Sequence, residues 1–150
     1  MADADAPHTP PAERSDIRWK QRFDNLQRAY RRLIAMLELL QQDQDSEVVR
    51  MAVIKAYEFT FELSWKTLKD YLAYNGIDAR LPREVIKQAF ASGLLIDGEL
   101  WIAMLEERNL MAHTDDDGRA KAAVTQIQNR YLAGLSQLHE LLAARLEETP

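Results

Sequence analysis

A single proline, Pro82, interrupts the chain between Ser15 and the C-terminal Glu-Glu-Thr-Pro. The same stretch lacks the alternating Val, Ile and Thr pattern that marks a half-buried strand. Because proline ends helices and alternation indicates strands, their near absence predicts an all-α fold. The 150 residues are 47% hydrophobic and 29% charged, which is typical of one globular domain with an apolar core.

The first 15 residues differ in composition from the rest of the chain. They include Pro7, Pro10 and Pro11 among small and acidic residues, and they bury too little apolar surface to offset the entropy of ordering. We expect a disordered tail over residues 1–15 and a helical domain over residues 16–147. The chain has no secretory signal pattern, no run of about 18 apolar residues and no cysteine, so we expect a cytoplasmic protein that does not enter a membrane.

Capping residues and apolar spacing divide the domain into helices. Long helices with short connections favour an antiparallel four-helix up-and-down bundle, in which the short helix that begins at Pro82 is only a connector. The second long helix has two apolar stripes and is expected to be central, and Trp19, Trp65 and Trp101 are expected in the core. The expected helices run from Ser15 or Asp16 to about Gln42, from Asp45 or Ser46 to about Asn75, over Pro82–Gly93, from a cap at Asp97 to the break at Thr114–Gly118, and from that break onward.

Two groups of charged residues have both a structural and a functional interpretation. Glu58, Glu62, Lys66 and Asp70 repeat every four residues and would form one polar line on the second helix. We interpret this line as an ion-paired solvent face, with the lining of an active cleft as the alternative. The carboxylates of Asp115–Asp117 suit a hard cation, but we expect them to cap the last helix instead.

At one place in the sequence an arginine, an amide and a histidine converge: Arg108, Asn109 and His113. Residues four apart share a helix face, so Asn109 and His113 would lie together, and the long side chain of Arg108 reaches the same space. Arginine binds phosphodiesters, and histidine moves protons near neutral pH, so the set suits metal-free cleavage of RNA. In the structural alternative, Arg108 forms a solvated ion pair with the two glutamates before it. His113 would then only interact favourably with the dipole at the end of its helix.

The order of three sequence stretches makes the chain resemble a known family. The chain is similar to the HEPN-type nucleotidyltransferase substrate-binding proteins, which include the HepT-like toxins, over about residues 17–146. The stretches are Tyr57-Glu-Phe-Thr-Phe-Glu-Leu-Ser-Trp-Lys-Thr-Leu-Lys-Asp-Tyr-Leu, then Pro82-Arg-Glu-Val-Ile-Lys-Gln-Ala-Phe90, and, after Ile96-Asp-Gly-Glu-Leu-Trp101, Met104-Leu-Glu-Glu-Arg-Asn-Leu-Met-Ala-His-Thr114.

The resemblance implies a helical homodimer that associates with a minimal nucleotidyltransferase encoded beside it. It also implies that Arg108, Asn109 and His113 form a ribonuclease site at the dimer interface, with RNA as substrate and with neither metal nor cofactor. Where the transferase acts as antitoxin, it adenylylates a tyrosine two residues after the histidine. Here that position is Asp115, which has no phenolic acceptor and adds negative charge beside the site.

Two functions therefore stay open at the level of sequence. One is a ribonuclease toxin that uses Arg108 and His113. The other is a non-catalytic substrate-binding subunit of a nucleotidyltransferase, a role the resemblance also includes. The net charge of −5 gives no general attraction for nucleic acid, so binding of RNA would depend on a local basic site.

Overall fold

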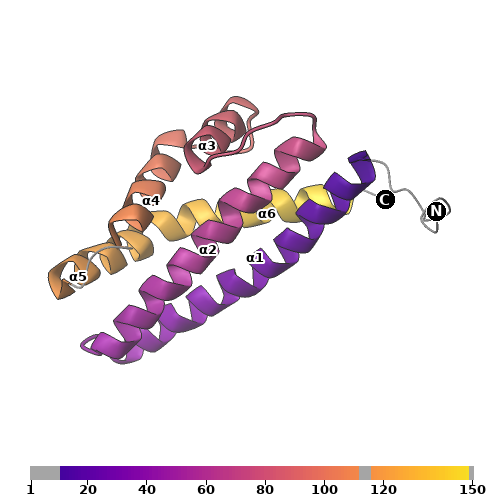
Figure 1. The fold of residues 1–150 in the computed structure, drawn as a ribbon. Coiled ribbons are helices and arrows are strands. Elements are labelled where there is room, and N and C mark those ends of the chain that lie inside the picture. The colour runs from indigo at the N-terminus through magenta and orange to yellow at the C-terminus, as the bar shows by residue number, and fades with distance from the viewer. Residues whose placement is uncertain (1–10, 112–115, 149–150) are drawn as a thin grey trace, which may run out of the picture.

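The computed structural model describes residues 11–111 and 116–148, and this part of the chain contains helices and connections without strands (Figure 1). None of the helices described is both long and apolar enough to cross a membrane. The helices are α1 (Pro11–Gln42), α2 (Glu47–Tyr74), α3 (Pro82–Ala91), α4 (Gly98–Met111), α5 (Asp117–Gln126), a π-helical turn (Ile127–Tyr131) and α6 (Leu132–Glu148).

The helices form the predicted antiparallel four-helix bundle. In Figure 1, α1 and α2 run side by side in opposite directions, α4 returns along α2, and α5 continues into α6 as one rod. The fourth member of the bundle is therefore α5, the π-helical turn and α6 together. The short helix α3 connects the top of α2 to α4, as expected.

The start of α1 corrects the predicted boundary of the tail. The helix begins at Pro11, before Ser15, so residues 11–15 are helical; residues 1–10 lie outside the described part. A proline suits the first helical position because its fixed φ matches the helix and its missing N–H would be unpaired there. Asp16 caps nothing and instead accepts hydrogen bonds from Trp19 Nε1 at 3.0 Å and Lys20 Nζ at 2.9 Å.

The other predicted helix ends are confirmed within the described residues. Ser46 Oγ accepts from the Val49 amide at 3.1 Å, and Asp97 Oδ1 accepts from the Leu100 amide at 3.0 Å. After α2 and α3 the chain turns at Gly76 (φ 84°) and Gly93 (φ 78°), where the left-handed backbone favours glycine. These local signals set the lengths of the helices and hence which residues can meet across the bundle.

Helix α2 is the centre of the bundle and contacts every other α-helix. Its apolar side packs on a core that includes Trp19, Trp65 and Trp101, each at most 8% exposed. Its small polar residues Thr60, Ser64 and Thr67 are also buried. Each of these hydroxyls donates to the carbonyl four residues earlier, at 2.6–2.7 Å, so no partner from another helix is needed.

The sequence did not predict the π-helical turn in the last helix. Its end residues Ile127 and Tyr131 are both buried, and the apolar series continues through Leu135, Leu138 and Leu142, as expected. Gly134 follows this turn at the contact with α4, where a Cβ atom would lie 3.0 Å from Leu100 Cδ2. The glycine lets α6 approach α4 closely.

Candidate functional site

The last turns of α4 lie against the middle of α2, and this contact forms the candidate site. The hydroxyl of Tyr57 in α2 donates to the Met104 carbonyl of α4 at 2.9 Å, in the protein interior. Burial raises the pKa of Tyr57 well above its ordinary value, so the phenol stays protonated as a donor. This bond fixes α4 on α2 one turn before Arg108.

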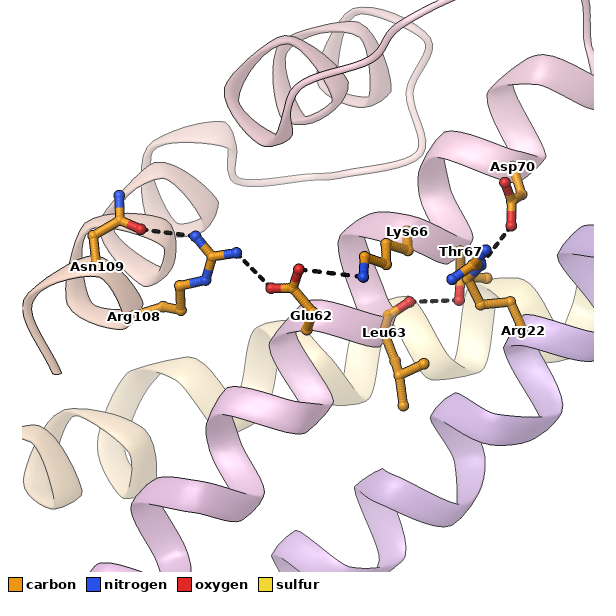
Figure 2. Close-up of polar contacts among 8 residues, drawn as sticks. All are labelled: Arg22, Glu62, Leu63, Lys66, Thr67, Asp70, Arg108 and Asn109. Atoms are coloured by element: carbon orange, nitrogen blue, oxygen red, sulfur yellow. Dashed lines mark hydrogen bonds and ion pairs between the residues drawn. The ribbon is translucent and has the colours of Figure 1, made fainter. Parts of the chain in front are cut away.

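Arg108 joins the two helices through its guanidinium group, as Figure 2 shows. Its Nη2 donates to Glu62 Oε2 of α2 at 2.5 Å, and its Nη1 donates to Asn109 Oδ1 at 2.8 Å. The side chain is 27% exposed, so the group is anchored and still reachable from solvent. A guanidinium carries five N–H donors, so donors remain for an incoming anion.

Glu62 lies between two cations. Its Oε1 is 3.5 Å from Lys66 Nζ, while its Oε2 binds Arg108. Burial alone would raise the pKa of Glu62, but the hydrogen bond from Arg108 and the charges of Arg108 and Lys66 outweigh it and lower that pKa. Glu62 is therefore ionised at neutral pH and holds the guanidinium in place.

The polar line on α2 does not form the expected solvent face. Glu62 binds Arg108 of α4, and Asp70, which is 7% exposed, accepts from Arg22 Nε of α1 at 2.6 Å. Figure 2 shows the line reaching toward a different helix at each of these two residues. Glu62 lines a cleft, as the alternative interpretation expects, and the activity of that cleft stays a prediction. The four-residue repeat was the available signal, but it does not say which helix each residue faces.

The structure brings two of the three predicted site residues together and leaves the third outside its described part. Arg108 and Asn109 are in contact, with Asn109 exposed, while His113 and Asp115 are not among the described residues. The proposed ion pair with the preceding glutamates is wrong. Glu106 pairs with Arg83 at 3.7 Å, and Glu107 accepts from Tyr131 Oη at 3.4 Å.

Two adjoining clefts open at the end of α4, and Arg108 lines the smaller one. The smaller has a volume of about 240 Å³ and is lined by Lys55, Glu58, Phe59, Glu62 and Arg108. The larger, of about 700 Å³, lies between α2, α4 and the start of α5 and also includes Lys55 and Glu58. Its walls also combine apolar side chains, carboxylates and one further cation: Met51, Ile54, Leu110, Met111, Ala120, Ala122, Glu47, Glu107, Asp116, Asp117 and Arg119.

Asp116, the described acidic residue before α5, caps that helix. Asp116 is its N-cap residue and accepts from the Gly118 amide at 2.9 Å, as predicted. Asp117 pairs with Arg50 of α2 at 3.2 Å and with Lys121 at 3.5 Å. In the described ranges, no cluster of three or more histidine, aspartate or glutamate side chains has the arrangement to hold a metal ion.

The match to a known family covers most of the bundle. A family model described as "Nucleotidyltransferase substrate binding protein like" matches residues 21–144. The chain belongs to this family. The match includes both helices of the candidate site, so the Glu62–Arg108 contact lies inside the family's own domain.

Individual members of the nucleotidyltransferase substrate-binding family are also similar to the chain. A Haemophilus influenzae protein described as "Probable ribonuclease HepT" is 33% identical over 97 residues, which are 61% of this chain and 66% of that protein. A solved structure from H. influenzae, described as the fold of a substrate-binding domain of a nucleotidyltransferase, is 26% identical with a TM-score of 0.69, and the match covers 81% of this chain and 98% of that one.

A further solved structure shares the fold at low sequence identity. The Shewanella oneidensis HEPN toxin, solved tri-AMPylated and in complex with the MNT antitoxin, matches with a TM-score of 0.69 and 13% identity. The match covers 84% of this chain and 96% of the toxin. At this identity the comparison establishes a common bundle and nothing further.

Proposed function

We propose that this chain is the helical subunit of a two-component HEPN and minimal-nucleotidyltransferase toxin–antitoxin system, and that it cleaves RNA in the cytoplasm without a metal. The observation that best supports this proposal is the Arg108 guanidinium, which Glu62 anchors at 2.5 Å and Asn109 at 2.8 Å, in the smaller of the two adjoining clefts. Fixed donors that already have the right orientation bind an anion without a further ordering cost. The naming of a relative as a probable ribonuclease supports the same assignment.

In the proposed reaction Arg108 binds the scissile phosphate through its remaining N–H donors. His113 accepts the proton of a ribose 2′-hydroxyl, whose oxygen forms a bond to phosphorus. The bond from phosphorus to the 5′ oxygen breaks, and the leaving oxygen takes a proton from the imidazolium. The products are a 2′,3′-cyclic phosphate and a free 5′-hydroxyl.

We further propose that two copies of the chain pair across the face of the bundle that carries Arg108. Large apolar side chains are exposed around the clefts on this face: Met51 at 52%, Phe59 at 62% and Leu110 at 51%. A two-fold contact through this face would cover them and bring both sites together. Light scattering should give the mass of a dimer, and Phe59→Ser should shift it toward the monomer; a monomeric wild type would contradict the pairing.

The decisive experiment is incubation of the pure protein with RNA in EDTA, followed by analysis of the RNA ends. Wild type should produce 2′,3′-cyclic phosphates, and Arg108→Ala and His113→Ala should each lose at least about 100-fold in rate. Arg28→Ala is the matched control, because Arg28 also pairs with a carboxylate, Asp24 at 2.7 Å, but is exposed on α1. Cleavage that survives in both site variants would defeat the proposal.

A non-catalytic, substrate-binding role is the second candidate, and the acidity of the site favours it. The smaller cleft balances Glu58 and Glu62 against Lys55 and Arg108, but the larger cleft has more carboxylates than cations. In addition, Asp115 stands where a modifiable tyrosine is expected. Carboxylates weaken the attraction of this region for phosphates. Two measurements on the same protein distinguish the two functions. A non-catalytic subunit would bind the neighbouring nucleotidyltransferase at micromolar concentration in a calorimeter but would not cleave RNA.

A further inference from the structure

A second groove lies between α3 and α4, away from Arg108. It has a volume of about 590 Å³ and a largely apolar lining. Glu99 and Glu106 lie on the side of α4 that faces this groove. Because successive residues turn by about 100° around a helix, Arg108 lies on roughly the opposite side of α4 from both glutamates. The lining residues are Ile86, Phe90, Ile96, Ile102, Ala103, Lys87, Asp97, Gly98, Glu99 and Glu106.

Two large apolar side chains at the mouth of this groove are exposed. Phe90 is 52% exposed and Ile96 is 77% exposed, although Leu94 and Leu95 between them are buried and anchor the turn. Phe90 packs against Gly98, where an added Cβ would lie 3.1 Å from Phe90 Cγ. The ring is therefore held at the surface by the helix behind it. An exposed aromatic ring that already packs against the protein has less freedom to lose on binding.

The rim of the groove is acidic. Asp97, Glu99 and Glu106 line it together with Lys87, and Arg83 of α3 pairs with Glu106 at 3.7 Å, so the rim keeps an excess of one negative charge. Glu99 and Glu106 are seven residues apart and so lie on one side of α4, about 10 Å apart along the axis. A second copy of this chain suits this surface poorly, because a two-fold contact would set two rims with the same excess of negative charge against each other.

We propose that this groove binds an amphipathic helix of the partner nucleotidyltransferase, with apolar side chains seated between Phe90 and Ile102 and with Lys or Arg residues facing Glu99 and Glu106. Apolar anchors in a groove with complementary charges on the rim are the usual way in which a helix binds such a site. The identity of the partner rests on the proposed function, whereas the chemistry of the docking helix rests on the groove. The arrangement leaves the Arg108 face free.

The test is calorimetric titration of the full chain with the purified neighbouring nucleotidyltransferase. Phe90→Ala and Ile96→Ser should each weaken binding about tenfold. The double charge reversal Glu99→Lys with Glu106→Lys should weaken it by at least as much at low salt, and high salt should reduce this last effect. Leu39→Ser, which also changes an exposed apolar residue (46%) but on α1, is the control and should bind as wild type. Circular dichroism and thermal unfolding confirm that each variant is folded.

Three outcomes would overturn the proposal, and they separate it from the proposed function. Equal binding by wild type and all groove variants would reject the groove as the binding site but keep the nucleotidyltransferase as the partner. Loss of binding in Phe59→Ala but not in Phe90→Ala would place the partner on the Arg108 face instead. Absence of binding by wild type would reject the partner and the groove together, while RNA cleavage in EDTA would still report on Arg108 independently.

Discussion

Arg50 of α2 forms an ion pair with Asp117, the first residue of α5, at 3.2 Å, and Arg50 is only 6% exposed. In a second ion pair the acidic residue is on α2 instead: Glu62 of α2 pairs with Arg108 at the end of α4. The two contacts lie on either side of residues 112–115 in the sequence. Helix α2 therefore positions both chain segments that flank His113.

The first prediction concerns the stability of the Arg50–Asp117 pair. Asp117→Asn leaves a buried guanidinium without its counter-charge, so we expect the free energy of unfolding to fall by about 1–3 kcal/mol. Urea unfolding at pH 7 measures this change. Asp116→Asn is the matched control, because asparagine caps a helix as well as aspartate does, and it should stay within about 0.5 kcal/mol of wild type. Equal loss in both variants would contradict the prediction.

The second prediction concerns the pH dependence of the Glu62–Arg108 pair. Because the pKa of Glu62 is lowered in the folded protein, its ionisation stabilises the fold above the ordinary glutamate pKa, about 4.3, and this stability is lost as the pH falls through the folded-state value. Glu62→Gln should therefore cost about 0.5–1 kcal/mol at pH 7, and less near pH 3. Glu58→Gln, whose partner Lys55 is exposed, should show a smaller difference at pH 7. A cost for Glu62→Gln that does not change with pH would count against the charge interaction.

The helices could be predicted from sequence because their signals are local. The spacing of Trp19, Phe23 and Leu26 identifies one face of α1 from the helical period alone, and caps such as Ser46 act on amides within three residues. The meaning of a proline at the start of a helix is ambiguous when only its neighbours in the sequence are considered. Pro11 has the composition of a tail residue and the geometry of a first helical residue, and the second interpretation is the correct one.

The candidate site could be predicted only in part, because its contacts join distant segments. Arg108 and Asn109 were found from their own short stretch, whereas Glu62 lies 46 residues earlier in the chain. The polar line identified Glu62 and Asp70 as unusual on an apolar helix. Which of them faces α4 and which faces α1 depends on how α2 packs, and no local pattern contains that information.

The third prediction concerns His139, which packs against two aromatic rings of α1. The ring centroids of Phe23 and Tyr30 lie 5.5 and 5.2 Å from that of His139. Burial, with the nearby charge of Arg31, lowers the pKa of His139. As the pH is lowered, the unfolded chain therefore binds a proton at His139 at a higher pH than the folded chain does. The free energy of unfolding then falls as the pH drops below about 6.5. His139→Phe should show less acid destabilisation than wild type between pH 7.5 and 5.5, as approximate limits set by the histidine pKa. An NMR titration with a His139 pKa at or above 6.5 would refute the prediction.

The last prediction uses Glu62 to test whether the Arg108 face binds RNA phosphates. Glu62→Gln keeps an oxygen that accepts from Arg108 and removes one negative charge beside it. A unit charge about 4 Å away changes a binding energy by about 1 kcal/mol even in water, so a non-cleavable 2′-deoxy oligonucleotide should bind about fivefold more tightly at low salt. The gain should shrink as salt screens the charge. Fluorescence anisotropy at two salt concentrations measures both effects. Glu38→Gln makes the same charge change on the exposed side of α1, so an equal gain there would mean that only net charge matters.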